Sequence, residues 1–254
     1  MMSFIVVFYL VVFSAQTGTA GGVISVGPIA PVQGDAAEPD ALYAKRDDVA
    51  MAQRAAAIWQ ARLKQNPNDF ESAWKLARAT YWIGTQAPAV NDRRQALEQG
   101  ITAGRAATRV EPNRPEGHMW LAANMGALAE SFGLRQGLKY RGEIKDELLT
   151  VLRLDAAFEQ GSADRALGRW YYKVPGLFGG SNKKSEEHLR RSLTYNPNNT
   201  ASLYFLAETL IAMKRKDEAK NVLQRLLAGP IDPAWAAEDR DFQKKASVLV
   251  KTLS

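Results

Sequence analysis

Arginines and aromatic residues recur at spacings of three and four in two segments of the chain, and these side chains are well suited to ligand chemistry. Such spacing places the members of each set on one helical face. Guanidinium groups bind carboxylates through paired hydrogen bonds, and aromatic rings supply apolar walls. The pattern predicts a surface for an organic acid or an acidic peptide. The predicted ligand-binding residues are Trp74, Arg78, Tyr81, Trp82, Arg165, Arg169, Tyr172, Lys173 and Tyr204.

The alternative is that these residues are structural. The arginines would then pair with neighbouring acids such as Glu71 and Glu208, and the aromatic rings would pack the helices together. The corresponding places in the intervening segment, Met119 and Ala123, carry no charge. The sequence leaves both interpretations open.

Other kinds of chemistry find little support. The chain has no cysteine, which excludes disulfides, thiolate metal sites, cysteine nucleophiles and a cysteine-linked lipid anchor. His118 and His188 are too few for a multi-histidine metal site, and we expect His118 to pack between helices. The glycine-rich stretch 176–185 fails the spacing of a phosphate loop, so we interpret it as a turn in which Ser181 caps the next helix. We expect a protein that is not an enzyme and needs no cofactor.

The net charge of +6 could suggest an anionic partner. However, acidic residues separate the basic pairs, and no basic stripe with interleaved aromatic residues is present. We therefore expect no nucleic-acid partner.

The candidate residues belong to a repeated helical pattern. Apolar residues recur at three and four from Asp40 onward, which is typical of amphipathic helices. Similar helix endings surround Pro67, Pro112 and Pro197, separated by 45 and 85 residues, and a fourth ending is expected near Ala156. Proline cannot continue the preceding helix. A period of this length indicates stacked helical repeats.

The pattern within each repeat predicts how the helices pack. Before most endings a small residue is followed four places later by a bulky one, as in Ala55 and Trp59, so that a neighbouring helix can approach closely. Residues 164–171 are close to the tetratricopeptide signature, with Asp164 in the Trp place and Leu167 and Gly168 in the Leu-Gly places. That face must pack inside, which leaves the arginine and aromatic face to line the concave surface.

We therefore predict an all-α protein: a right-handed α-solenoid of four tetratricopeptide-like helix–turn–helix units. An extra N-terminal helix at about 40–66 precedes them, and a capping helix at about 236–253 follows. The units are longer than the usual 34 residues. We expect the excess in the turns at 85–92, 132–139 and 173–182.

The N-terminus has the pattern of a targeting segment. Residues 4–13 form an unbroken apolar run, which is too short to span a bilayer, and small residues follow up to Ala20. We predict a signal peptide over 1–20 cut after Ala20, an unstructured leader over 21–39 and a folded domain over 40–254. No lysine or arginine precedes the apolar run, so an uncleaved anchor is the alternative. The prediction implies a periplasmic or secreted protein.

The stretch 171–181, the residues that follow it up to Leu189, and the ending with Asp232-Pro233, Glu238-Asp239 and Phe242 resemble a known family. They are similar to the T component of tripartite ATP-independent periplasmic (TRAP) transporters, over about residues 40–254. The resemblance implies a periplasmic helical protein that self-associates and works beside the substrate-binding protein of a carboxylate transporter. A weaker resemblance, to the regulator of microtubule dynamics proteins, rests on the long-period repeats, but the signal segment argues against that eukaryotic setting.

Two functions follow as hypotheses. The first is an accessory component of a periplasmic uptake system that binds a small organic anion, the substrate-binding protein, or both. The second is a general interaction scaffold of the cell envelope that grips an extended peptide. Such repeat folds serve many functions, so the fold does not choose between them.

Overall fold

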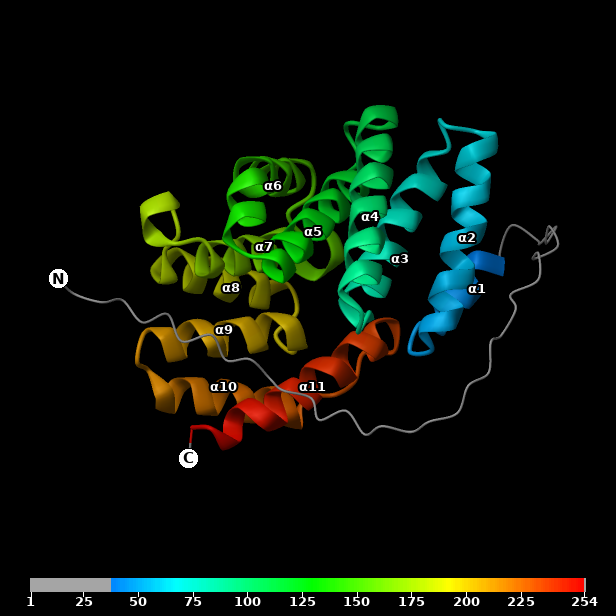
Figure 1. Cartoon of the computed structure of the whole chain (residues 1–254). Helices are drawn as coiled ribbons and strands as arrows, with labels where there is room; N and C mark the ends of the chain where they lie inside the picture. Colours follow the sequence, from blue (N-terminus) through cyan, green and yellow to red (C-terminus); the bar gives the residue numbers. More distant parts are fainter. Residues whose placement is uncertain (1–37, 254) are drawn as a thin grey trace. The chain divides into compact units, whose positions relative to one another are not determined.

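The computed structural model describes residues 38–253, and this part of the chain contains helices and turns but no strands. The predicted signal peptide, and most of the predicted leader, lie outside the described residues. Within the described range, eleven α-helices and two short 3-10 helices follow one another (Figure 1). The α-helices are α1 (Glu38–Tyr43), α2 (Val49–Gln65), α3 (Phe70–Gln86), α4 (Val90–Val110), α5 (Pro115–Phe132), α6 (Leu134–Leu154), α7 (Phe158–Lys173), α8 (Asn182–Tyr195), α9 (Thr200–Ala212), α10 (Lys216–Ala228) and α11 (Ala236–Lys251); the 3-10 helices are η1 (Gly176–Phe178) and η2 (Pro233–Trp235).

The helices form the four predicted pairs, α3–α4, α5–α6, α7–α8 and α9–α10. The two helices of each pair pack on each other, and each pair packs on the next. In addition α3 contacts α5, α5 contacts α7, and α7 contacts α9, so these first helices lie side by side. We call α3, α5, α7 and α9 the inner helices. The predicted all-α solenoid of tetratricopeptide-like units is confirmed.

The recurring helix endings occupy equivalent places. Helices α2, α4, α6 and α8 are followed by the C-cap residues Asn66, Glu111, Asp155 and Asn196, where φ lies between −158° and −131°. The next inner helix starts three or four residues later. Asp69 and Asn199 cap α3 and α9, since their side chains accept hydrogen bonds from free backbone N–H groups in the first turn.

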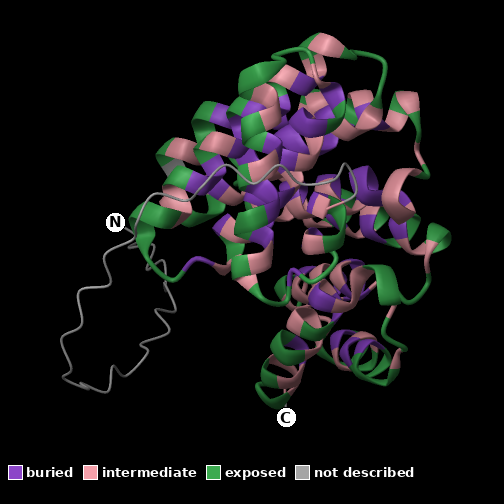
Figure 2. Cartoon of the chain, turned by 90° about the vertical axis from the view of Figure 1, so that its right-hand side faces the viewer, coloured by how far each residue is buried: buried purple, intermediate pink, exposed green. Residues whose placement is uncertain are grey.

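Small residues allow the helices to approach one another closely. A Cβ atom placed on Gly104 in α4 would lie 2.8 Å from the Cα of Leu121 in α5. Ala55 and Trp59, the small and bulky pair in α2, are both buried. Buried residues lie where helices face one another, and exposed residues lie on the outer turns (Figure 2).

Two details differ from the sequence prediction. The lone helix at 40–66 is two helices, α1 and α2, separated by a turn that contains Arg46. The extended turn expected at 132–139 is wrong, since α5 ends at Phe132 and α6 begins at Leu134. The extra residues lengthen α4 and α6, which have 21 residues each.

The two histidines join neighbouring helices. His118 of α5 contacts Glu147 of α6 through Nδ1 at 2.5 Å and the Pro112 carbonyl through Nε2 at 2.8 Å. His188 of α8 contacts the fully buried Asp164 of α7 at 2.7 Å. Glu147 and Asp164 each lie on a different helix from the histidine that they contact. Residue spacing along one helix therefore could not predict these contacts.

Candidate functional site

Arg78 of α3 lies among aromatic rings. Its guanidinium carbon is 4.4 Å from the centre of the Tyr43 ring and 4.8 Å from that of Trp74. Its Nη2 atom is 3.9 Å from a carboxylate oxygen of Asp40, the limit of an ion pair. The buried Nε atom has no hydrogen-bond partner among the described residues. These contacts therefore hold Arg78 in place and leave its Nε–H group free to donate a hydrogen bond.

Arg165 of α7 makes no ion pair or hydrogen bond with the described residues, and its Nη1 atom is buried. Burial lowers the pKa of Arg165, while Glu159, Tyr81 and Glu238 act in the opposite direction. Buried charged groups are normally paired because leaving them unpaired is costly. An unpaired guanidinium of this kind is a strong candidate for binding an anion.

Two indole groups of the same apolar cluster add further free donors. The Nε1 atoms of Trp74 and Trp120 are buried and have no hydrogen-bond partner among the described residues. The Trp120 ring lies 5.7 Å from the Tyr81 ring. Burial raises the pKa of Tyr81 to about 12, so its hydroxyl stays protonated.

Glu159 is an acidic residue whose charge is influenced by both arginines. It forms no ion pair or hydrogen bond with another described residue. Burial raises the pKa of Glu159 to about 7, although Arg78 and Arg165 act to lower it. We call the following set the inner cluster: Tyr43, Trp74, Arg78, Tyr81, Trp120, Glu159 and Arg165.

The backbone at Glu159 is unusual. Glu159, Gln160 and Gly161 all have left-handed conformations, with φ of 45°, 60° and 71°. This conformation is costly for residues other than glycine. It is maintained by Gln160, which donates to Asp232 at 2.9 Å and accepts from Asn196 at 2.7 Å and Asn199 at 3.1 Å.

The other predicted residues form a separate paired group. Arg169 binds Glu130 through two hydrogen bonds of 2.9 and 2.8 Å and Glu208 through one of 2.5 Å. Lys173 is 3.4 Å from the same Glu130. The structural interpretation therefore describes Arg169 well, and its partner Glu208 is one of the two acids named from the sequence.

The remaining predicted aromatic residues lie in three different surroundings. Tyr172 lies beside Arg169, with 5.7 Å between the guanidinium carbon and the ring centre. Tyr204 packs against Phe242 of α11, with 5.6 Å between ring centres. Trp82 is buried and donates its indole N–H to the Arg46 carbonyl at 2.7 Å, so its indole has no hydrogen-bond donor left for a ligand.

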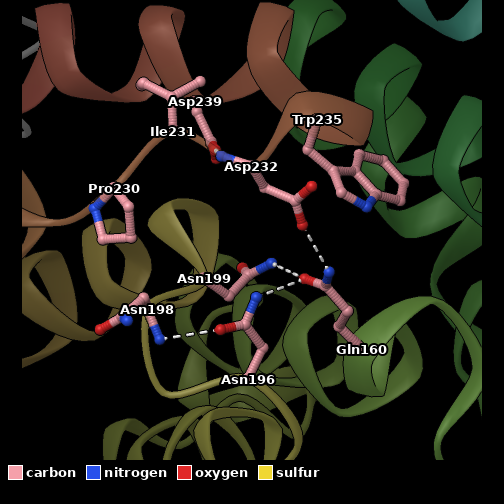
Figure 3. Close-up of a pocket in the computed structure, with 9 residues that line it drawn as sticks. All are labelled: Gln160, Asn196, Asn198, Asn199, Pro230, Ile231, Asp232, Trp235 and Asp239. Carbon is pink, nitrogen blue, oxygen red and sulfur yellow. Dashed lines mark hydrogen bonds between the residues drawn. The ribbon is translucent and has the colours of Figure 1, made fainter.

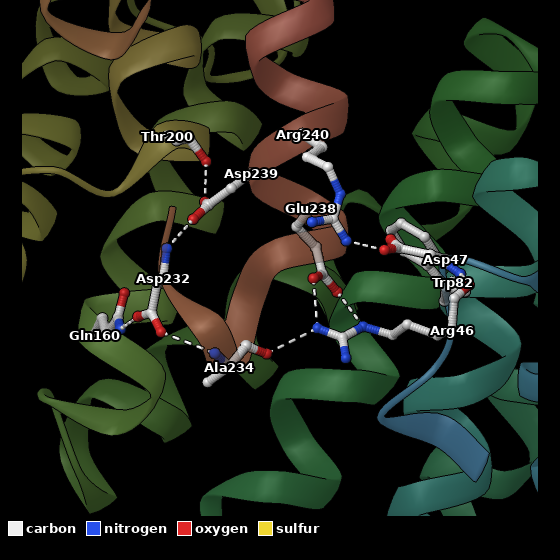
Figure 4. Close-up of polar contacts among 10 residues, drawn as sticks. All are labelled: Arg46, Asp47, Trp82, Gln160, Thr200, Asp232, Ala234, Glu238, Asp239 and Arg240. Atoms are coloured by element: carbon white, nitrogen blue, oxygen red, sulfur yellow. Dashed lines mark hydrogen bonds and ion pairs between the residues drawn. The ribbon is translucent and has the colours of Figure 1, made fainter. Parts of the chain in front are cut away.

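The C-terminal helix α11 reaches the N-terminal end of the repeats (Figure 4). Arg46 binds Glu238 through hydrogen bonds of 2.8 and 2.5 Å and the Ala234 carbonyl through one of 2.9 Å. Arg240 pairs with Asp47. We call these two ion pairs the latch. Because Ala237 packs into the same apolar cluster as Tyr43 and Trp120, α11 covers part of the inner cluster.

Asp239 fixes the start of α11 from the other side. Its carboxylate accepts from the Thr200 hydroxyl at 2.6 Å and from the Asp232 backbone N–H at 2.8 Å. A polar cavity of about 220 Å³ lies beside this contact, near Gln160 (Figure 3). Its lining consists of Gln160, Asn196, Asn198, Asn199, Pro230, Ile231, Asp232, Trp235 and Asp239.

Two further searches of the described part gave negative results. No group of three or more histidine, aspartate or glutamate side chains within residues 38–253 could hold a metal ion. In the same range, no helix combines the length and apolar character needed to cross a membrane.

Two family models match the chain. The TRAP transporter T-component model matches residues 120–252, just over half of the chain. The chain belongs to the TRAP transporter T-component family. The model named Regulator of microtubule dynamics protein 1-3 matches residues 36–178, also more than half, so the chain belongs to that family too. No curated protein matches the sequence.

One of two similar solved structures supports the fold of this T-component family member. A thermophilic TPR protein of Thermus thermophilus aligns with 83% of this chain and 96% of its own, at 21% identity and a TM-score of 0.62. A crystal structure of MamA aligns with 79% of this chain and 95% of its own, at 16% identity and a TM-score of 0.49. The first of these shows a shared tetratricopeptide fold.

The family ending noted in the sequence now has a structural role. Asp232 binds Gln160, Glu238 binds Arg46, and Asp239 binds Thr200, so each acidic residue of that ending attaches α11 to the repeats. Sequence reasoning missed Glu159, Trp120 and Tyr43 as members of the inner cluster. Glu159 precedes the regular part of α7, and Tyr43 precedes the repeats, so neither follows the repeat spacing.

Proposed function

We propose that this protein is a non-enzymatic accessory component of a TRAP-type carboxylate uptake system. In this role the inner cluster binds a small organic anion, and the outside of the repeats contacts the transporter's substrate-binding protein. Family membership and the tetratricopeptide fold support the transport and protein-binding parts of the proposal.

The unpaired Arg165 guanidinium, whose Nη1 atom is buried, is the observation that carries the anion site. A ligand carboxylate would supply the missing acceptor for its Nη1 atom. The free Arg78 Nε atom and the indole N–H groups of Trp74 and Trp120 offer further donors. The aromatic rings around them suit the apolar part of an organic acid.

The position of α11 favours a small ligand over an extended peptide. Ala237 and the latch cover part of the inner cluster, so a peptide would have to displace the protein's own C-terminal segment. The general scaffold that grips a peptide is therefore the second candidate.

Ligand titration tests the anion site. Fluorescence of Trp74 and Trp120 should change when 3-phenylpropanoate is added to the protein. Arg165→Gln should weaken binding about ten- to a hundredfold, because a charge-assisted contact is lost. Arg105→Gln is the control, since Arg105 is exposed on α4 and pairs with Glu143. Equal affinity in the native and Arg165→Gln proteins would contradict the anion site.

The location and partner need separate tests. Periplasmic residence rests on the predicted signal peptide, and fractionation of cells tests it. Pull-down from a periplasmic extract should recover a TRAP substrate-binding protein, and recovery of none would count against the transport role. Self-association, implied by the family resemblance, would be excluded by light scattering that shows a monomer at micromolar concentration.

A further inference from the structure

We propose that a surface formed by α6, the turn around η1 and the start of α8 docks the protein on membranes rich in anionic phospholipid. This surface, which we call the docking face, combines three leucines with three basic residues: Leu138, Arg141, Lys145, Leu149, Leu177 and Lys184. It shares no residue with the inner cluster, so the proposal does not depend on the anion site.

The turn between α7 and α8 holds an apolar side chain out in the solvent. Leu177, in the middle of η1, is 88% exposed, the highest value among the exposed large hydrophobic residues of the described part of the chain. In Figure 1 this turn, coloured yellow-green, projects at the left beyond α7. Transfer of an exposed leucine side chain from water to an apolar environment is favourable. Leu177 is therefore a candidate for insertion into a bilayer.

Backbone hydrogen bonds fix the conformation of this turn. The Ser181 N–H donates to the Tyr171 carbonyl at 2.8 Å, and the Gly180 N–H donates to the Pro175 carbonyl at 3.2 Å. The turn is also closely packed, since a Cβ atom on Gly180 would lie only 1.6 Å from a backbone oxygen. Leu177 is thus presented on a preorganised turn, which reduces the ordering cost of binding.

Aromatic rings bring basic residues from two helices together beside this turn. The Nζ atoms of Lys145 in α6 and Lys184 in α8 lie 5.6 and 5.5 Å from the centre of the Tyr171 ring. The guanidinium carbon of Arg141 lies 5.5 Å from the centre of the Phe178 ring, which belongs to η1. Three cations therefore lie close to the exposed turn.

The basic residues of this region lack counter-charges. Within residues 135–149 and 174–188, the basic residues that form no ion pair with another described residue are Arg135, Lys139, Arg141, Lys145, Lys183 and Lys184. Most acidic residues of the same two segments contact basic residues outside them: Glu143 contacts Arg105, Glu147 contacts His118, and Glu186 contacts Arg215. Among the described acids of these segments, Asp146 and Glu187 are left without an ion pair, so positive charge is in excess.

Leucines on α6 extend the apolar part of the docking face. Leu138 and Leu149 are both exposed. They lie about three helical turns apart, and Arg141 and Lys145 lie between them on the same side of the helix. A surface of this kind suits the boundary between lipid headgroups and acyl chains, where cations meet phosphates and leucines meet hydrocarbon.

The arrangement favours a membrane over a protein partner. Leu177 projects from the surface, so its partner must close around the side chain. A fluid bilayer does this without a preformed pocket. Anionic headgroups also supply negative charge on every side of the leucine, where the unpaired cations lie, and basic residues near such a surface are attracted to it.

A fluorescent label at position 177 tests contact with lipid. The chain contains no cysteine, so Leu177→Cys provides one site for an environment-sensitive nitrobenzoxadiazole label. With vesicles of phosphatidylglycerol and phosphatidylcholine in equal parts, the emission should rise and shift to the blue. Vesicles of phosphatidylcholine alone should leave it unchanged. Val90→Cys, at a site on α4 that is 61% exposed, is the matched control and should keep its spectrum.

The readout is the position that responds, not the total amount of protein bound, because the apolar run at residues 4–13 is also able to bind vesicles. Raising the salt concentration should weaken the response at position 177, since salt screens the attraction between the cations and the headgroups. Circular dichroism checks that each labelled variant is folded.

Substitutions test the apolar and the basic components separately, with the label on Leu138→Cys as the reporter. Leu177→Asp should raise the lipid concentration of the half-maximal response about tenfold or more. Lys145→Gln combined with Lys184→Gln should also raise it about tenfold or more. The control combines Lys216→Gln with Lys244→Gln, two exposed lysines without an ion pair among the described residues, and should leave it within about twofold.

Each outcome decides for or against the docking face. A response at position 177 that needs phosphatidylglycerol, with none at position 90, would support it. No response at position 177, an equal response to phosphatidylcholine alone, or an equal loss in the two lysine pairs would overturn it. A blue shift at position 177 that follows protein concentration without vesicles would show that the face joins two copies of the chain, which would also overturn the membrane assignment.

Discussion

Arg46 and Glu238 lie 192 positions apart in the sequence, yet their side chains form a two-point ion pair with nitrogen–oxygen distances of 2.8 and 2.5 Å. Their side chains are only 9% and 21% exposed, so the pair is largely shielded from water. It joins the turn between α1 and α2 to the first turn of α11. The contact explains why the acidic ending that resembles the T components contains a glutamate at this place.

The first prediction concerns this ion pair. Arg46→Met should lower the free energy of unfolding by about 2–3 kcal/mol, because Glu238 and the Ala234 carbonyl lose their charged partner. Arg105→Met, which removes an exposed pair with Glu143, should cost less than about 1 kcal/mol. Chemical denaturation measures both values. Similar costs for the two variants would show that the latch contributes no more than a surface pair.

The second prediction separates the side chain of Gln160 from its backbone. Gln160→Ala removes the hydrogen bonds to Asp232, Asn196 and Asn199 and should cost about 1–3 kcal/mol. Gln160→Gly removes the same bonds but relieves the left-handed strain at φ 60°, so it should be about 1 kcal/mol more stable than the alanine variant. Thermal unfolding ranks the two, and an alanine variant as stable as the glycine variant would contradict the strain.

The third prediction follows from the raised pKa of Glu159, about 7 in the folded protein. The folded state holds a proton on Glu159 that the unfolded state releases near pH 4.5, so this contribution to stability is complete below pH 4.5 and is lost as the pH rises through 7. Its full size is about 3 kcal/mol. Relative to the native protein, Glu159→Gln should therefore gain stability between pH 5 and pH 8. Denaturation at both pH values measures the gain, and a constant difference would refute it.

The fourth prediction tests the close approach of α4 and α5. Gly104→Ala should cost about 1–3 kcal/mol, since the new Cβ would lie 2.8 Å from the backbone of Leu121. Gly126→Ala in α5 is the control, because nothing lies within 4 Å of its Cβ position. It should stabilise the protein by about 0.5–1 kcal/mol through helix propensity. Opposite signs in denaturant unfolding are expected, and a neutral Gly104→Ala would mean that the two helices can separate at little cost.

The fold could be predicted from the sequence because it depends on local signals that repeat. Each helix ending contains residues that cannot continue a helix, and the small and bulky positions recur with it, as at Ala55 and Trp59. The break after Tyr43 was missed because nothing between Tyr43 and Val49 interrupts a helix as proline would. The length of α6 was missed because Gly133 ends one helix and starts the next within a single residue.

The site could be predicted only in part. Trp74, Arg78 and Tyr81 share one face of α3 and Arg165 belongs to α7, and their role in ligand binding stays a prediction. Arg169 is instead paired with Glu130 and Glu208. Whether an arginine on this face has an ion-pair partner depends on which acidic residues the neighbouring helices place beside it. The position of Glu159 depends on a left-handed backbone conformation that no pattern in the sequence predicts.

Stacked repeats usually behave as open linear arrays, in which each unit senses only its neighbours and the ends fray first. The latch connects the two ends of this array, because its last helix is bound to the turn before its first repeat. This connection requires a fixed number of repeat units, because inserting or deleting one unit would move Arg46 away from Glu238. Homologues with a different number of repeats should therefore lack this ion pair. Destabilising one end of the array should also destabilise the other end.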